Sequence, residues 1–87
     1  MYCYIISEGK YEIEHIFFGA TKDEVVEKAR PMINEWWEYK AMNNEEIIDF
    51  AENDETEFDL VKIKGKLPKE DISKEELVII YNSRHNG

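Results

Sequence analysis

The segment Thr21–Trp37, TKDEVVEKARPMINEWW, combines a helix start signal with a long apolar stripe. Thr21 is a typical helix N-cap residue, and Glu24 stands three residues later, which is the spacing of a capping box. The apolar residues recur at three- and four-residue intervals, as they do in a helix that lies on a sheet. They are Val25, Val26, Ala29, Met32, Ile33, Trp36 and Trp37. The sequence therefore predicts one long helix that begins directly after Thr21.

Pro31 falls inside this predicted helix but off its apolar stripe. A proline within a helix removes one backbone hydrogen bond and bends the helix axis. Such a bend would be convex to solvent and would wrap the helix around the sheet. Two shorter helices, the second with Pro31 at its first position, fit the sequence equally well.

A β-hairpin is predicted on the N-terminal side of the helix. The segments Tyr2–Ile6 (YCYII) and Tyr11–Phe18 (YEIEHIFF) are rich in β-branched and aromatic residues, and the polar segment Ser7–Lys10 (SEGK) separates them. If Glu8 and Gly9 form a two-residue turn, the two strands share one face that we expect to be core. This face carries Tyr2, Tyr4, Ile6, Tyr11, Ile13 and His15. The opposite face carries Cys3, Ile5, Glu12 and Glu14.

A short helix and two further strands are predicted on the C-terminal side. Asn43 or Asn44 can cap a helix that covers about residues 45–52. The segments Phe58–Lys64 (FDLVKIK) and Leu77–Tyr81 (LVIIY) have the composition of strands, and a turn-rich segment separates them. Because Leu77–Tyr81 is an unbroken apolar run, we expect this strand to be buried on both sides.

The predicted order of elements is that of an α+β fold. We expect a two-layer sandwich in which the long, kinked helix and the short helix cover one face of a largely antiparallel sheet. The chain of 87 residues is too short for two ordinary domains, so residues 1–87 are expected to form one domain. Residues 82–87 are expected to be a frayed tail.

Composition excludes several classes of function. A net charge of −9 argues against direct binding to nucleic acid or anionic lipid, because such ligands attract clusters of Lys and Arg. No apolar run approaches the length of a membrane span, and no secretory signal is recognisable. Cys3 is the single cysteine, so no intramolecular disulfide can form. These features predict a cytoplasmic protein that binds basic partners.

The negative charge is concentrated in Asn44–Asp59, NEEIIDFAENDETEFD, which contains eight carboxylates and no Lys or Arg. One interpretation is a solvated face that serves only solubility. A calcium loop is disfavoured because the segment has no glycine for the sharp turn, and no metal site is expected because neither His nor Cys accompanies the carboxylates. The third interpretation is a surface that contacts a positively charged protein.

Two rows of carboxylates support this third interpretation. On a helix, Glu45, Asp49 and Glu52 lie one above the other. On a strand, Glu55, Glu57 and Asp59 would share one face, and both rows would resemble the spacing of phosphates. Such a surface could occupy the basic channel of a nucleic-acid-binding enzyme. The candidate partner-binding carboxylates are Glu45, Asp49, Glu52, Asp54, Glu55, Glu57 and Asp59.

Three aromatic residues complete the candidate surface. Trp36 and Trp37 are adjacent and therefore point about 100° apart on a helix, so one of them is expected at the edge of the core. The pair either fills core and boundary or, together with Tyr39, anchors a protein partner.

No catalytic signature accompanies these features. His15 is expected in mid-strand as a structural residue, and Cys3 has no neighbouring cation that would activate its thiol. The sequence has no glycine-rich phosphate loop, zinc-ligand spacing or nucleophile motif. We therefore expect a protein that is not an enzyme and that needs no cofactor.

In size, acidity and lack of catalytic motifs, the chain is similar to the small inhibitors that bacteriophages encode against host defence or nucleic-acid machinery, including anti-CRISPR proteins. The resemblance is one of composition and implies a stand-alone inhibitor that occludes a basic surface, as a DNA mimic does. The alternative is a subunit or homodimer that pairs through an exposed sheet edge, with the acidic segment serving solubility alone. A small-ligand binder is a third class of function, but no motif in the sequence specifically indicates it.

Overall fold

The computed structural model describes the backbone of residues 2–85 and the side chains of residues 2–83. Within these residues the fold is α+β, as predicted from the sequence, with four helices and a three-stranded antiparallel sheet. The elements follow in the order β1 (Tyr2–Glu8), β2 (His15–Gly19), α1 (Lys22–Ile33), α2 (Trp37–Lys40), α3 (Asn44–Glu52), β3 (Phe58–Lys64) and α4 (Lys74–His85). No described helix has both the length and the apolar character that a membrane crossing requires.

Strand β1 is the centre of the sheet, between β2 and β3. β1 and β2 form the predicted hairpin, but the predicted two-residue turn and its register are wrong. The connecting loop runs from Gly9 to Glu14, and Glu8, rather than Tyr2, pairs with His15. The loop folds back on itself because Gly9 has a φ of 145° and the Glu14 amide donates to the Glu8 carbonyl at 2.8 Å.

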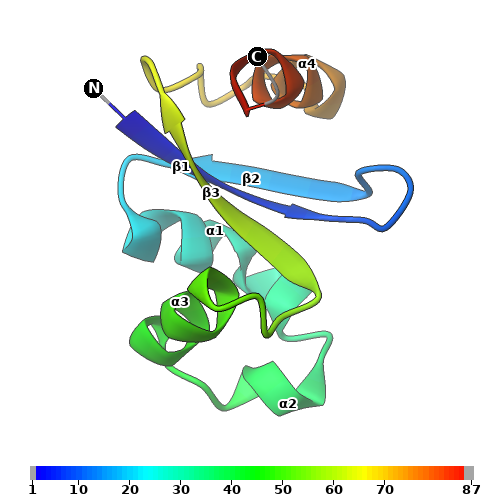
Figure 1. Ribbon diagram of the computed structural model, residues 1–87, viewed down its shortest axis with the longest axis vertical. Helices are drawn as coiled ribbons and strands as arrows, with labels where there is room; N and C mark the ends of the chain where they lie inside the picture. Colours follow the sequence, from blue (N-terminus) through cyan, green and yellow to red (C-terminus); the bar gives the residue numbers. More distant parts are fainter. Residues whose placement is uncertain (1, 86–87) are drawn as a thin grey trace.

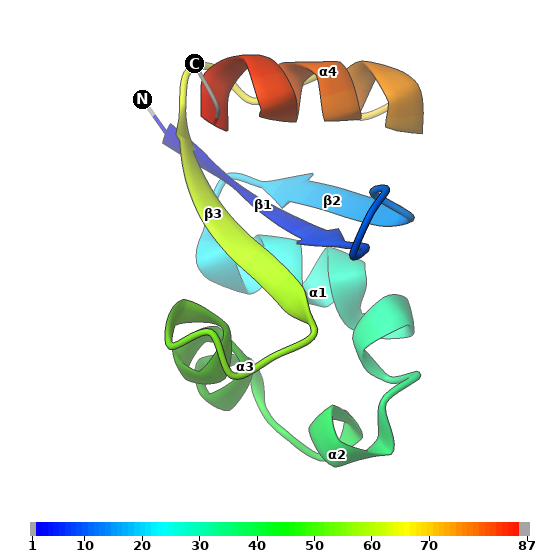
Figure 2. The same ribbon diagram turned by 45° about the vertical axis from the view of Figure 1, so that its right-hand side comes forward.

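Helices cover both faces of the sheet (Figures 1 and 2). Helices α1, α2 and α3 lie on one side, and α4 lies on the other. The expected two-layer sandwich accounts for the first side only, so α4 adds a third layer. Because successive residues of β1 point to opposite faces, Ile6 faces the first group of helices and Ile5 faces α4.

Two apolar cores result from this layering. The first core contains Ile6, Val25, Val26, Ala29, Met32, Ile33, Tyr39, Ile47, Ala51 and Phe58. The second core contains Cys3, Ile5, Phe18, Ile63, Leu77 and Tyr81. The face of the hairpin that carries Cys3 and Ile5 was expected outside the core, and this expectation is wrong because α4 buries it.

Helix α4 replaces the strand that was predicted at Leu77–Tyr81. The Ser73 hydroxyl accepts a hydrogen bond from the Glu76 amide at 3.2 Å and so caps the helix. Leu77 and Tyr81, one turn apart, are buried against the sheet, whereas the Ile79 side chain is 67% exposed. Residues 82–85, which were expected in a frayed tail, belong to this helix, and residues 86–87 lie outside the described residues.

Helix α1 begins where the sequence predicts, but it is shorter than expected. The Thr21 hydroxyl accepts from the Glu24 amide at 3.1 Å, which confirms the N-cap. The helix ends at Ile33, two residues after Pro31, and no second helix starts at the proline. Pro31 has no amide hydrogen to donate, so it weakens the last turn and favours termination there. Trp37 instead begins the separate short helix α2.

Candidate functional site

Helix α3 positions the first row of predicted carboxylates. Asn43 and Glu46 form a reciprocal capping box: the Asn43 side-chain oxygen accepts from the Glu46 amide at 2.9 Å, and the Glu46 carboxylate accepts from the Asn43 amide at 3.2 Å. This fixes the start of the helix and confirms Asn43 as its N-cap. Ile47 and Ala51 are buried on the inner face. Glu45, Asp49 and Glu52 consequently lie exposed on the outer face, as predicted.

The chain then turns through Asp54, whose φ of 56° is left-handed, and enters β3, where Asp59 is exposed. Two open hollows follow this path. One is lined by Asn43, Glu45, Glu46, Ile48, Asp49 and Glu52. The other is lined by Ala51, Glu52, Asp54, Asp59, Leu60, Val61 and Tyr81. Because Glu52 lines both, the structure joins five of the predicted carboxylates into one acidic strip, made of Glu45, Asp49, Glu52, Asp54 and Asp59.

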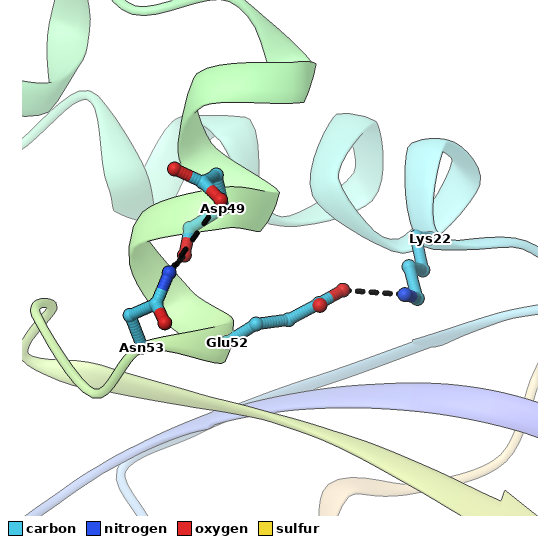
Figure 3. A network of polar contacts seen from close by, with 4 residues as sticks. All are labelled: Lys22, Asp49, Glu52 and Asn53. Carbon is cyan, nitrogen blue, oxygen red and sulfur yellow. Dashed lines mark hydrogen bonds and ion pairs between the residues drawn. The ribbon is translucent and has the colours of Figure 1, made fainter.

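Among the described side chains, one ion pair reaches the acidic strip. Figure 3 shows that Glu52 is ion-paired with Lys22 of α1, and the hydrogen bond to Glu52 raises the pKa of Lys22 above its ordinary value. The Asn53 amide group donates to the Asp49 backbone carbonyl at 2.8 Å, next to the Asp49 carboxylate (Figure 3). Among the residues that the structure describes, the other four strip carboxylates have no Lys or Arg partner within 4.0 Å.

Glu55 and Glu57 do not join the acidic strip. The expected row of Glu55, Glu57 and Asp59 on a strand is not formed, because β3 begins only at Phe58. The Glu55 amide donates to the Phe50 carbonyl at 2.9 Å, which keeps this part of the chain coiled against the end of α3. Both glutamates lie in the connecting loop and line neither hollow.

Of the three candidate aromatic residues, Trp37 is the most exposed. Its side chain is 85% exposed, whereas Tyr39 is 7% exposed. Trp36 is half-buried and packs against Tyr39 and Phe58, with ring centroids 6.2 and 6.1 Å apart respectively. The prediction that one tryptophan lies at the edge of the core is therefore confirmed. Tyr39 belongs to the first core and Trp36 packs against it, so Trp37 is the candidate aromatic residue that offers the most exposed surface to a partner.

The structure also assembles a group of residues that the sequence analysis did not connect. The possible metal-ligand atoms of Glu8, Glu14 and His15 lie within 4.8 Å of one another at the loop end of the hairpin. Glu8 and His15 are cross-strand partners, and Glu14 precedes β2 directly. The adjacent Glu14 and His15 were visible in the sequence, but placing Glu8 beside them required the correct loop length.

Comparisons of the chain with protein family models, with curated proteins and with solved structures found no match. What this chain does is therefore inferred from its own surface, on which the acidic strip and the exposed Trp37 are the most prominent features.

Proposed function

We propose that this chain is a binding protein that covers a basic surface on a partner protein and acts by stoichiometric occlusion rather than by catalysis. The observation that carries the proposal is the acidic strip, in which only Glu52 has an ion-pair partner among the described residues. Like charges at helical spacing repel one another and give no stability to the fold. A partner with Lys and Arg side chains would relieve this repulsion on binding.

Charge alone would give fast encounter but weak binding. Exposed charges at the rim of an interface mainly change the association rate and its salt dependence, whereas a buried aromatic residue holds a complex together. Trp37 supplies such a residue, because its ring is almost fully exposed on α2. Helices α2 and α3 lie on the same side of the sheet (Figure 2), so one partner could contact both.

The partner class that fits best is a protein that handles nucleic acid. The basic groove of such a protein is built to neutralise phosphates, and carboxylates can compete for the same Lys and Arg side chains. Glu45, Asp49 and Glu52 provide a regular row along α3 for this competition. Inhibition of host defence by a phage-type protein, either anti-CRISPR-like or DNA-mimic-like, is the biological setting that the composition favours.

Two variants of equal net charge test the proposal. In the strip variant, four strip carboxylates become amides: Glu45→Gln, Asp49→Asn, Asp54→Asn and Asp59→Asn. In the control variant, four exposed carboxylates elsewhere become amides: Glu12→Gln, Glu27→Gln, Glu35→Gln and Asp71→Asn. Each variant raises the net charge of −9 by four, so a difference between them reports position rather than total charge. Glu52 is left intact in both to keep its ion pair with Lys22.

Each protein serves as bait in a host lysate, and captured proteins are eluted with duplex DNA or single-stranded RNA at low salt. We expect the wild type and the control variant to capture a basic protein that nucleic acid elutes, and the strip variant to capture at least tenfold less. Trp37→Ala should shorten the lifetime of the captured complex. Equal capture by the strip and control variants would contradict the proposal, as would a partner that nucleic acid cannot displace.

A homodimer or subunit is the second candidate, and the open edge of β2 favours it. β2 is an edge strand of the described sheet, and a hollow beside it is lined by Ile16, Phe17, Phe18, Lys28, Glu70, Ile72, Lys74 and Leu77. A second strand could pair with this edge and cover the apolar side chains. Sedimentation of the purified chain over a range of concentrations separates the two candidates, because a stable dimer would favour this one.

A further inference from the structure

The loop end of the β1–β2 hairpin carries a set of possible metal ligands that is independent of the acidic strip. We propose that Glu8, Glu14 and His15 form a binding site for a divalent transition-metal ion, with Zn²⁺ as the best fit. The three side chains converge, since one ligand atom from each lies within 4.8 Å of the other two. The proposal does not depend on the proposed partner of the acidic strip.

The backbone of the hairpin holds the three residues together. The register of β1 and β2 places Glu8 directly opposite His15. The Glu14 amide donates to the Glu8 carbonyl at 2.8 Å, which returns the loop to the end of β1. A Cβ atom at Gly9 would lie 2.0 Å from the Glu12 carbonyl oxygen, so this tight loop requires glycine there.

The distances suit a small metal ion. His15 Nδ1 and Glu8 Oε2 are 2.9 Å apart. Zn²⁺ binds imidazole nitrogen and carboxylate oxygen at about 2.0–2.2 Å, which puts two neighbouring ligand atoms of one ion about 3 Å apart. An ion can therefore take the position between Glu8 and His15 without unfolding the hairpin. Glu14 supplies the third ligand, and water completes the coordination.

The donor set selects the class of metal. One imidazole with two carboxylates suits Zn²⁺ and related transition-metal ions, whereas Ca²⁺ and Mg²⁺ prefer oxygen ligands alone. His15 is what distinguishes this site from the acidic strip, which contains no His or Cys. Two carboxylates beside an exposed imidazole also concentrate negative charge where a divalent cation would sit.

Metal binding by the folded full-length chain tests this site directly. Titration with ZnCl₂ in a calorimeter, and with Co²⁺ followed by its visible absorption, should show saturable binding of one ion per chain. We expect His15→Asn and Glu14→Gln each to weaken binding at least tenfold. Glu12→Gln is the matched control, because it removes the same charge from the same loop without touching the ligand set, and it should bind as the wild type does.

Thermal melts without metal show whether each variant is folded. Glu14→Gln keeps the proposal testable even if His15→Asn disturbs the hairpin, because Glu14 is an exposed loop residue. The site is overturned if Zn²⁺ does not bind saturably, or if the Glu14 and His15 variants bind it as tightly as Glu12→Gln does. Equal affinity for Ca²⁺ and Zn²⁺ would also overturn it, since nonspecific attraction to carboxylates would then explain the binding.

Discussion

Tyr39 is the residue at which the acidic segment meets the first core. Its ring packs edge-on against Phe58, with centroids 5.8 Å apart and an interplanar angle of 82°. Its hydroxyl reaches the Glu55 carbonyl at 3.4 Å, a long and therefore weak hydrogen bond. Burial is the main cause that raises the pKa of Tyr39 above its ordinary value, and the charges of Glu38 and Glu57 add to the increase.

This raised pKa predicts how stability depends on pH. The phenol ionises at a lower pH in the unfolded chain than in the folded chain, so the contribution of Tyr39 is complete below the ordinary value of about 10. The contribution is lost as the pH rises through the folded-state pKa. Between pH 8 and 11, we expect the free energy of unfolding to decrease more for the wild type than for Tyr39→Phe. At pH 8 the free energy of unfolding of Tyr39→Phe should be lower than that of the wild type by only about 0.5 kcal/mol.

Urea unfolding at each pH measures these differences. Tyr11→Phe is the control, because it removes the same hydroxyl from a residue that is 93% exposed. Parallel pH profiles for the wild type and Tyr39→Phe would show that the titration of Tyr39 does not influence stability.

The start signals of helices could be read from the sequence, because a cap depends on residues close together in the chain. Thr21 and Asn43 were identified in this way. The sequence Ser73–Glu76, SKEE, has the same capping pattern, but the unbroken apolar run that follows it was assigned to a strand. An apolar run of this length fits either element, and the need to cover Cys3 and Ile5 favours the helix.

What the sequence could not predict depends on contacts between distant segments. The hairpin register follows from the backward fold of its loop, and the third layer follows from α4 packing across β2 and β3. Within the site, the helical period identified the outer face of α3. The sequence placed Glu55 and Glu57 on a strand, whereas they lie in the loop before β3. This was not predictable from local sequence, because contacts with Tyr39 and the end of α3 hold the loop in place.

Leu77 tests the role of α4 as a cover for the second core. Leu77→Ala should cost about 2–4 kcal/mol of unfolding free energy, because it leaves a cavity beside the sheet. The buried thiol of Cys3 lies in the same core, so its rate of labelling by a thiol reagent should increase as well. Ile79→Ala on the outer face is the control and should change stability by less than about 0.5 kcal/mol. Similar effects of the two substitutions would contradict the packing of α4.

At the scale of the whole molecule, charge is distributed unevenly. The acidic strip gathers carboxylates from α3, the following turn and β3, while positively charged residues are absent from Asn44–Asp59. The pairs Glu45–Asp49 and Asp49–Glu52 have helical spacing, and each such like-charge pair costs about 0.2–0.5 kcal/mol. The acidic strip therefore slightly destabilises the fold.

This uneven distribution predicts that the strip variant gains stability. Its amide residues should raise the free energy of unfolding by about 0.5–1 kcal/mol at low salt, because two repelling helical pairs are removed. The control variant should gain less, since its four positions are dispersed. In about 1 M salt the difference should vanish, because charges are then screened beyond about 3 Å. Unfolding curves that differ equally at both salt concentrations would mean that repulsion within the strip is not the cause.

The placement of α4 over the first strand has a consequence for synthesis on the ribosome. β1 is the first described element to be translated and α4 is the last, yet Ile5 and Leu77 share one core. At ordinary elongation rates several seconds separate their appearance. Throughout this interval the apolar face of β1 in the nascent chain remains uncovered. Chaperones that bind apolar segments can therefore bind it before α4 is synthesised.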